Sequence, residues 1–123
     1  MTHLINKKTI LVVEDEPDIL FSVKTFLESE GYKVFTATNG NEALEVLNKF
    51  KLPHLILLDM KMPVMNGWEF LRTFHNIYNH QAPVIIMTAA ADAEQRAKEV
   101  QASSWIGKPF SFEDISEKIR QFN

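Results

Sequence analysis

Five polar side chains closely follow short apolar runs of the chain: Glu14, Asp15, Asp59, Thr88 and Lys108. The runs read T-I-L-V-V, L-I-L-L, V-I-I-M and W-I. Unbroken apolar runs of this kind are typical of strands that are buried on both faces. In an open parallel sheet, functional groups gather beyond the carboxyl ends of the strands, so we expect these side chains to meet at one edge. An isolated Asp59 would be interpreted as a strand cap, but four units that deliver polar groups to one edge make that interpretation improbable.

These residue types suit the transfer of a phosphoryl group. Two carboxylates about 4 Å apart repel each other by about 4 kcal/mol at an effective dielectric constant of 20, so a cluster of three needs a positive partner. Oxygen ligands without His or Cys select a hard cation, and Mg²⁺ fits such a site better than Ca²⁺. Lys108 would add a positive charge and Thr88 a hydroxyl donor. A cation, a lysine and a hydroxyl around a carboxylate nucleophile are what formation of an acyl phosphate needs.

The composition excludes several other classes of function. The chain has 123 residues, a net charge of -3 and no cysteine, and its pI is about 5.8. Without a basic excess we expect no direct binding to nucleic acid, and without cysteine no disulfide, thiolate metal site or thiol nucleophile. No apolar run has the roughly 20 residues that a membrane span needs. The first ten residues lack the apolar core of a signal peptide, and we expect a cytoplasmic protein.

Strand and helix patterns alternate five times along the chain. The expected strands lie at 9–13, 33–37, 55–58, 84–87 and around 105–106. The expected helices run from Pro17 to Gly31, from the Asn39-Gly40-Asn41 turn to Pro53, from Gly67 to Asn79, over 92–100, and from Ser111 to the end. Helical spacing predicts that their buried faces include Phe50, Ile77 and Phe112. Such alternation predicts an α/β fold, a parallel sheet with helices on both faces, in one domain over 1–123.

The chain resembles the response regulator receiver domains of two-component signal transduction, which are CheY-like. The motifs that carry the resemblance are V-V-E-D-E-P, L-L-D-M-K-M-P-V-M-N-G, M-T-A and K-P-F, and together they span the chain. The resemblance implies a flavodoxin-like fold with strand order 2-1-3-4-5. It also implies a phosphoprotein that catalyses its own phosphorylation and dephosphorylation but is not an enzyme with a separate substrate.

The resemblance implies a role for each site residue. Asp59 would accept the phosphoryl group from a phosphohistidine of a histidine kinase or histidine phosphotransfer protein. Asp15 and Asp59 would bind Mg²⁺ directly, Glu14 through water, and Lys61 through its backbone carbonyl, with Mn²⁺ as a possible substitute. Thr88 and Lys108 would contact the phosphoryl oxygens.

The resemblance also implies a conformational switch. Thr88 would move toward the phosphoryl group and the ring of Trp105 would follow it inward. The Lys108-Pro109 peptide bond would be cis. The output surface would consist of the fourth helix, fifth strand and fifth helix, where a downstream protein binds. We expect a monomer, or a weak dimer that depends on phosphorylation.

Several residues depart from the usual pattern of the family. Glu14 stands where an aspartate is usual, Trp105 where Tyr or Phe is commoner, and Gln101 where a helix often ends on Gly. The Gln101 position therefore predicts a strained or reshaped helix end. We expect the Lys61 side chain to point to water. The four histidines are expected at the surface: His3, His54, His75 and His80.

Two alternatives stay open at this point. One is an interaction module that keeps the fold but does not depend on phosphorylation. The other is a phosphohydrolase of the haloacid dehalogenase-like group, which needs a second aspartate where this chain has Lys61. Glu16 and Asp18 are interpreted as helix-start residues that act through capping and the helix dipole, and Trp68 as a half-buried packing residue.

Overall fold

The computed structural model describes residues 8–61, 65–79, 81–89, 91 and 93–122. Residues 1–7 lie outside these ranges, and so do two of the predicted surface histidines, His3 and His80. Five parallel strands form one sheet: β1 (Thr9–Val13), β2 (Lys33–Ala37), β3 (Leu55–Asp59), β4 (Val84–Ala89) and β5 (Ser104–Lys108). The strand order is β2-β1-β3-β4-β5, which confirms the predicted order 2-1-3-4-5.

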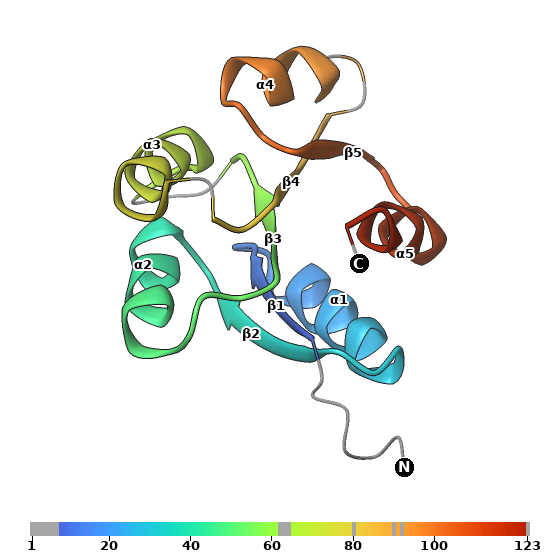
Figure 1. Ribbon diagram of the computed structural model, residues 1–123. Coiled ribbons are helices and arrows are strands. Elements are labelled where there is room, and N and C mark those ends of the chain that lie inside the picture. The colour runs from blue at the N-terminus through green and yellow to red at the C-terminus, as the bar shows by residue number, and fades with distance from the viewer. Residues whose placement is uncertain (1–7, 62–64, 80, 90, 92, 123) are drawn as a thin grey trace.

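Five helices connect and cover the strands: α1 (Pro17–Ser29), α2 (Gly40–Lys49), α3 (Gly67–Tyr78), α4 (Ala93–Glu99) and α5 (Phe112–Arg120). Figure 1 shows α1 and α5 on one side of the sheet, with α2 and α3 on the other and α4 beside β4 and β5. Alternate residues of each strand feed two separate cores. Ile10 and Val12 pack with α1 and α5, and Leu11 and Val13 with α2 and α3. Both faces of the sheet are therefore buried, as the apolar runs predicted.

Local sequence signals fix where the helices begin. Pro17 occupies the first position of α1, where a missing N–H costs nothing. Asn66 and Glu69 form a reciprocal capping box at the start of α3. Ser111 and Asp114 form another at the start of α5. The two boxes fix the starts of the helices that follow β3 and β5, the strands that end in Asp59 and Lys108.

Three predicted core aromatic or aliphatic residues are instead exposed. Ile77 is 62% exposed, because half-buried Tyr78 packs its ring on Phe74 in the last turn of α3, 5.3 Å between centroids. Phe50 is 49% exposed because it follows the end of α2 and stacks on a ring of the edge strand β2. Phe112 is 43% exposed at the first position of α5, where it stacks on an α1 ring. Helical spacing predicted which side of each helix faces the sheet, but not how far along the helix the contact with the sheet extends.

No helix within the described ranges combines the length and the hydropathy needed to cross a membrane.

Candidate functional site

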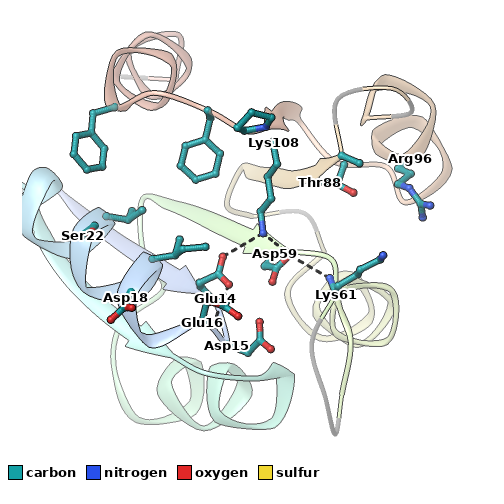
Figure 2. Close-up of a pocket in the computed structure, with 16 residues that line it drawn as sticks. Glu14, Asp15, Glu16, Asp18, Ser22, Asp59, Lys61, Thr88, Arg96 and Lys108 are labelled. Carbon is teal, nitrogen blue, oxygen red and sulfur yellow. Dashed lines mark hydrogen bonds and ion pairs between the residues drawn. The ribbon is translucent and has the colours of Figure 1, made fainter.

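The strand ends deliver all five predicted polar side chains to one cleft of about 1040 Å³. Glu14 and Asp15 follow β1, Asp59 ends β3, Thr88 lies in β4 and Lys108 ends β5. Figure 2 shows Asp59 at the centre of the cleft, with Lys108 reaching down to it and Glu14 and Asp15 on the α1 side. The site lies where β1 and β3 are neighbours and the chain order of the strands reverses.

Three carboxylates converge in the cleft. Glu14, Asp15 and Asp59 each offer an oxygen, and these oxygens all lie within 4.8 Å of one another. Glu14 is fully buried and Asp59 is 3% exposed, whereas Asp15 is half-buried. Asp59 Oδ1 accepts a hydrogen bond from the backbone N–H of Lys61, 3.2 Å away. This bond orients the Asp59 carboxylate at the end of its strand.

Lys108 is the positive partner of two of these carboxylates. Its Nζ donates to Asp59 Oδ1 at 3.3 Å and lies 3.6 Å from Glu14 Oε1. One ammonium group therefore faces two buried acids, and this leaves their negative charge only partly neutralised. The Lys108-Pro109 peptide bond is cis. The side chain of Lys108 is 30% exposed, so the centre of the cleft remains reachable from solvent.

Burial, helped by the neighbouring Asp59 carboxylate, raises the pKa of Glu14 to about 7 against the lowering effect of the Glu16 N–H and Lys108. The pKa of Asp59 is also raised, chiefly by burial, although the Lys61 N–H and Lys108 oppose this shift. Both shifts have the same physical origin, because a charged carboxylate loses hydration when it is buried.

The donor set fits a hard divalent cation. One oxygen of Glu14, Oε2, accepts the backbone N–H of Glu16 at 3.1 Å. The other, Oε1, is buried and finds no hydrogen-bond donor within the described part of the chain. A buried acceptor without a donor, beside two further carboxylates and no nitrogen or sulfur ligand, is what a Mg²⁺-type cation satisfies.

The other predicted residues lie around this centre. Thr88 is 8% exposed and lines the cleft, and the exposed Lys61 side chain lines it as well. Trp105 does not line the cleft: its half-buried ring lies in a separate hollow between β5 and α5. The Nζ of Lys118 stands 4.8 Å from the centroid of that ring. The ring of Trp105, the expected switch residue, is therefore contacted by α5.

Two side-chain interpretations from the sequence are wrong: the capping role of the Glu16 side chain and the surface position of His75. Glu16 occupies the N-cap of α1, but its side chain makes no capping hydrogen bond, and its N–H is bound by Glu14 instead. His75 is partly buried rather than at the surface, and its Nε2 lies 3.1 Å from the carbonyl oxygen of Val100. The predictions for Asp18 and Trp68 are confirmed, since Asp18 lies in the first turn of α1 and Trp68 is half-buried.

Sequence reasoning missed one charged residue of the cleft, Arg96. It lies in α4 and lines the same cleft as Asp59 and Thr88. Its guanidinium carbon is 5.5 Å from the centroid of the Trp68 ring on α3. No local motif marks this position, because an arginine on a short, weakly apolar helix is most simply a solvated side chain.

Fold and site together define a doubly wound α/β protein with an acidic centre at the carboxyl ends of its strands. The family comparison narrows this class to one family. The profile of the response regulator receiver domain family matches residues 10–120, and the chain belongs to that family. It is therefore a signalling domain of the two-component type, a class that works with histidine kinases and downstream effectors.

Curated relatives support the assignment over nearly the whole chain. Sporulation initiation phosphotransferase F of Bacillus subtilis is 36% identical, and the match covers 97% of this chain and 95% of that protein. The transcriptional regulatory protein CrdR of Helicobacter pylori is 37% identical over 94% of this chain. The present chain spans about half of CrdR, 55% of its length.

Solved structures share the fold closely. The chemotaxis response regulator CheY4 of Vibrio cholerae has a TM-score of 0.86 at 31% identity, with coverage of 96% of this chain and 100% of that one. The response regulator TrrA of Thermotoga maritima has a TM-score of 0.82 at 32% identity, with coverage of 94% and 99%. TrrA was solved in complex with Mg²⁺ and BeF.

Proposed function

We propose that Asp59 is the phospho-acceptor and that its phosphorylation switches the surface formed by α4, β5 and α5. The observation that carries the proposal is the environment of Asp59: an ammonium group at 3.3 Å, a backbone N–H at 3.2 Å and two further carboxylates in one cleft. A carboxylate so placed is held in orientation and is open to an incoming phosphoryl donor.

The proposed donor is a phosphohistidine on a histidine kinase or a histidine phosphotransfer protein. A carboxylate oxygen of Asp59 attacks phosphorus, an O–P bond forms, and the P–N bond to the donor imidazole breaks. The imidazole leaves with the electron pair of that bond and takes up a proton. The product is an acyl phosphate on this chain, so no separate substrate is turned over. Loss of the phosphoryl group to water returns the free carboxylate.

The groups around Asp59 have distinct tasks in this proposal. Asp15, Asp59, Glu14 through water and the backbone carbonyl of Lys61 would hold Mg²⁺, or Mn²⁺ in its place. When bound, the cation neutralises charge on the transferring group. Lys108 and the Thr88 hydroxyl would contact phosphoryl oxygens, and the movement of Thr88 would draw Trp105 inward. The Mg²⁺ and BeF complex of the related TrrA supports this assignment.

The remaining parts of the proposal concern the protein as a whole. We place residues 1–123 in one receiver domain of a cytoplasmic protein, as a monomer or a weak phosphorylation-linked dimer. Its output is a protein contact rather than direct binding to nucleic acid, because the net charge is -3.

The proposal is tested by incubation with acetyl phosphate and Mg²⁺ followed by intact-mass and peptide mass spectrometry. We expect the mass of one phosphoryl group to be added at Asp59, and no addition in Asp59→Asn. The matched control is Asp18→Asn, which removes one carboxylate from the rim of the same cleft and should still be phosphorylated. An unchanged mass of the parent protein would contradict the proposal and favour the phosphorylation-independent interaction module.

A further inference from the structure

Three positively charged side chains line the cleft within the described residues: Lys61, Arg96 and Lys108. They come from different kinds of element. Lys108 ends the edge strand β5 and is already engaged with Asp59 and Glu14. Lys61 lies in the loop after β3 with an exposed side chain. Arg96 alone of the three belongs to a helix, α4, which forms part of the proposed output surface.

Arg96 connects the cleft to the neighbouring helix α3. Its guanidinium carbon lies 5.5 Å from the centroid of the ring of Trp68, the second residue of α3, and both side chains are half-buried. Figure 2 shows Arg96 beside Thr88 at the side of the cleft opposite Asp18. A planar guanidinium over an indole ring is a favourable cation–π arrangement. The contact therefore holds α4 against α3 while it keeps a permanent positive charge at the edge of the cleft.

A second contact links the C-terminal end of α4 to α3. His75 Nε2 lies 3.1 Å from the carbonyl oxygen of Val100, the residue that follows α4. The two contacts are arranged differently with respect to the cleft, because Arg96 lines it and His75 does not. A change of charge at Asp59 would therefore act on α4 at Arg96, while the contact of His75 with Val100 anchors the C-terminal end of the helix.

Phosphorylation changes the balance of charge that Arg96 experiences. A phosphoryl group on Asp59 presents three acceptor oxygens and added negative charge in the cleft. Arginine is always charged, and its forked N–H groups match phosphate oxygens better than they match an aromatic face. Lys108 is already shared between two carboxylates, so it supplies only part of the neutralisation that the new charge requires.

We infer that Arg96 is a phosphoryl-binding residue whose guanidinium leaves the ring of Trp68 for the phosphoryl oxygens and moves the first half of α4 toward the cleft. The inference rests on the proposed function. In this inference, the Trp68–Arg96 contact stabilises the position that α4 has in the unphosphorylated state. The inference also gives α4 a direct response to Asp59 that does not pass through Thr88 and Trp105.

The test uses the whole chain labelled with 5-fluorotryptophan, which gives two ¹⁹F NMR signals because the chain has two tryptophans. Single substitutions Trp68→Phe and Trp105→Phe assign them. Mg²⁺ and beryllofluoride are then titrated into the parent protein, Arg96→Met, Arg96→Lys and the control Lys98→Met. Lys98 is the matched control because it carries the same charge on the same helix but pairs with Glu94 at the surface, 71% exposed.

In the parent protein and in Lys98→Met, we expect beryllofluoride to shift the Trp68 signal. In Arg96→Met the Trp68 signal should be displaced from the start and should not respond, and about tenfold more beryllofluoride should be needed for half-saturation, which corresponds to about 1.4 kcal/mol. Arg96→Lys should recover part of the affinity but not the starting Trp68 signal, because it restores charge without the planar fork.

The possible results separate this inference from the proposed function. If beryllofluoride with Mg²⁺ produces no saturable change in the parent protein, the assignment of Asp59 fails and the inference fails with it. If the parent protein and Arg96→Met bind beryllofluoride equally and the Trp68 signal does not move in either, the proposed function stands and Arg96 is only a packing residue. Circular dichroism on each variant establishes that it is folded before the titration is interpreted.

Discussion

Glu14 shows how the fold changes the chemistry of one residue. It is fully buried at the end of β1, with one oxygen bound by an N–H and the other without a donor in the described chain. Burial raises its pKa to about 7. Near neutral pH, either a proton or a cation can therefore neutralise the Glu14 carboxylate. A divalent ion would compete with protons for this site.

We expect the metal-free protein to lose stability as pH rises from about 4.5 to about 7. In that window folded Glu14 holds a proton that the unfolded chain has released, so the free energy of unfolding falls as pH increases. Asp59, whose pKa is also raised, acts in the same direction. The loss for Glu14 is on the order of 3 kcal/mol. Urea denaturation at several pH values in EDTA measures it.

Two comparisons check this assignment. Glu14→Gln keeps the shape of the side chain but cannot titrate, so most of the fall between pH 5 and pH 7 should disappear. Saturating Mg²⁺ should give the opposite trend, because the cation binds the deprotonated carboxylates and its stabilisation grows with pH. An equally steep fall in Glu14→Gln would show that the buried charge lies elsewhere.

Among the helices of the described residues, α4 is the shortest. It has seven residues, and the segment after it turns through Gln101 with a φ of 58°, in the left-handed region. Asn79 ends α3 in a similar conformation, with a φ of 51°. Asparagine tolerates this conformation far better than glutamine does. The departure at Gln101 noted in the sequence is therefore a strained helix end.

Gln101→Gly should stabilise the protein by about 1 kcal/mol, because glycine adopts the left-handed conformation without the steric cost of a Cβ. Asn79→Gly is the matched control and should change stability by much less, since asparagine already fits. Thermal unfolding of both variants measures the difference. Equal effects at the two positions would mean that Gln101 carries no strain.

Across the whole molecule, the site and the output surface share elements. The sheet places Thr88 and Lys108 on adjacent strands, where Thr88 faces Gly107 and Ala89 faces Lys108 in register. Helix α4 follows β4 and helix α5 follows β5, and Trp105 lies in β5 two residues before Gly107. In the proposed function, a change at Asp59 would therefore reach α4, β5 and α5 through one half of the sheet. The other half, β2 with α2, has no side chain in the cleft among the residues described.

Beryllofluoride with Mg²⁺ should alter amide hydrogen exchange over 84–109 and leave 40–49 nearly unchanged. The physical reason is that the residues proposed to contact the phosphoryl group lie on β3, β4 and β5, whereas α2 packs on β1 and β2. Exchange followed by mass spectrometry, with and without the mimic, measures this. Asp59→Asn is the control and should show no change. Equal protection of both segments would indicate general tightening instead of a directed switch.

Much of the fold was predictable because its signals are local. Apolar runs, turn residues and capping pairs such as Ser111 with Asp114 act over a few residues, and β-α alternation leaves few topologies. The positions of Asp59 and Lys108 at strand ends follow from the same pattern. Their meeting in one cleft was predicted because parallel strands end at the same edge.

The order of the elements, the polar residues at the strand ends and the family motifs could all be predicted from the amino-acid sequence. The full burial of Glu14, the exposure of Ile77 and the contact of Arg96 with Trp68 at the cleft could be found only from the folded chain. These properties depend on contacts between elements distant in the chain. Helical or strand spacing gives the side of an element on which a residue lies, but burial and charge depend on what the rest of the fold places there.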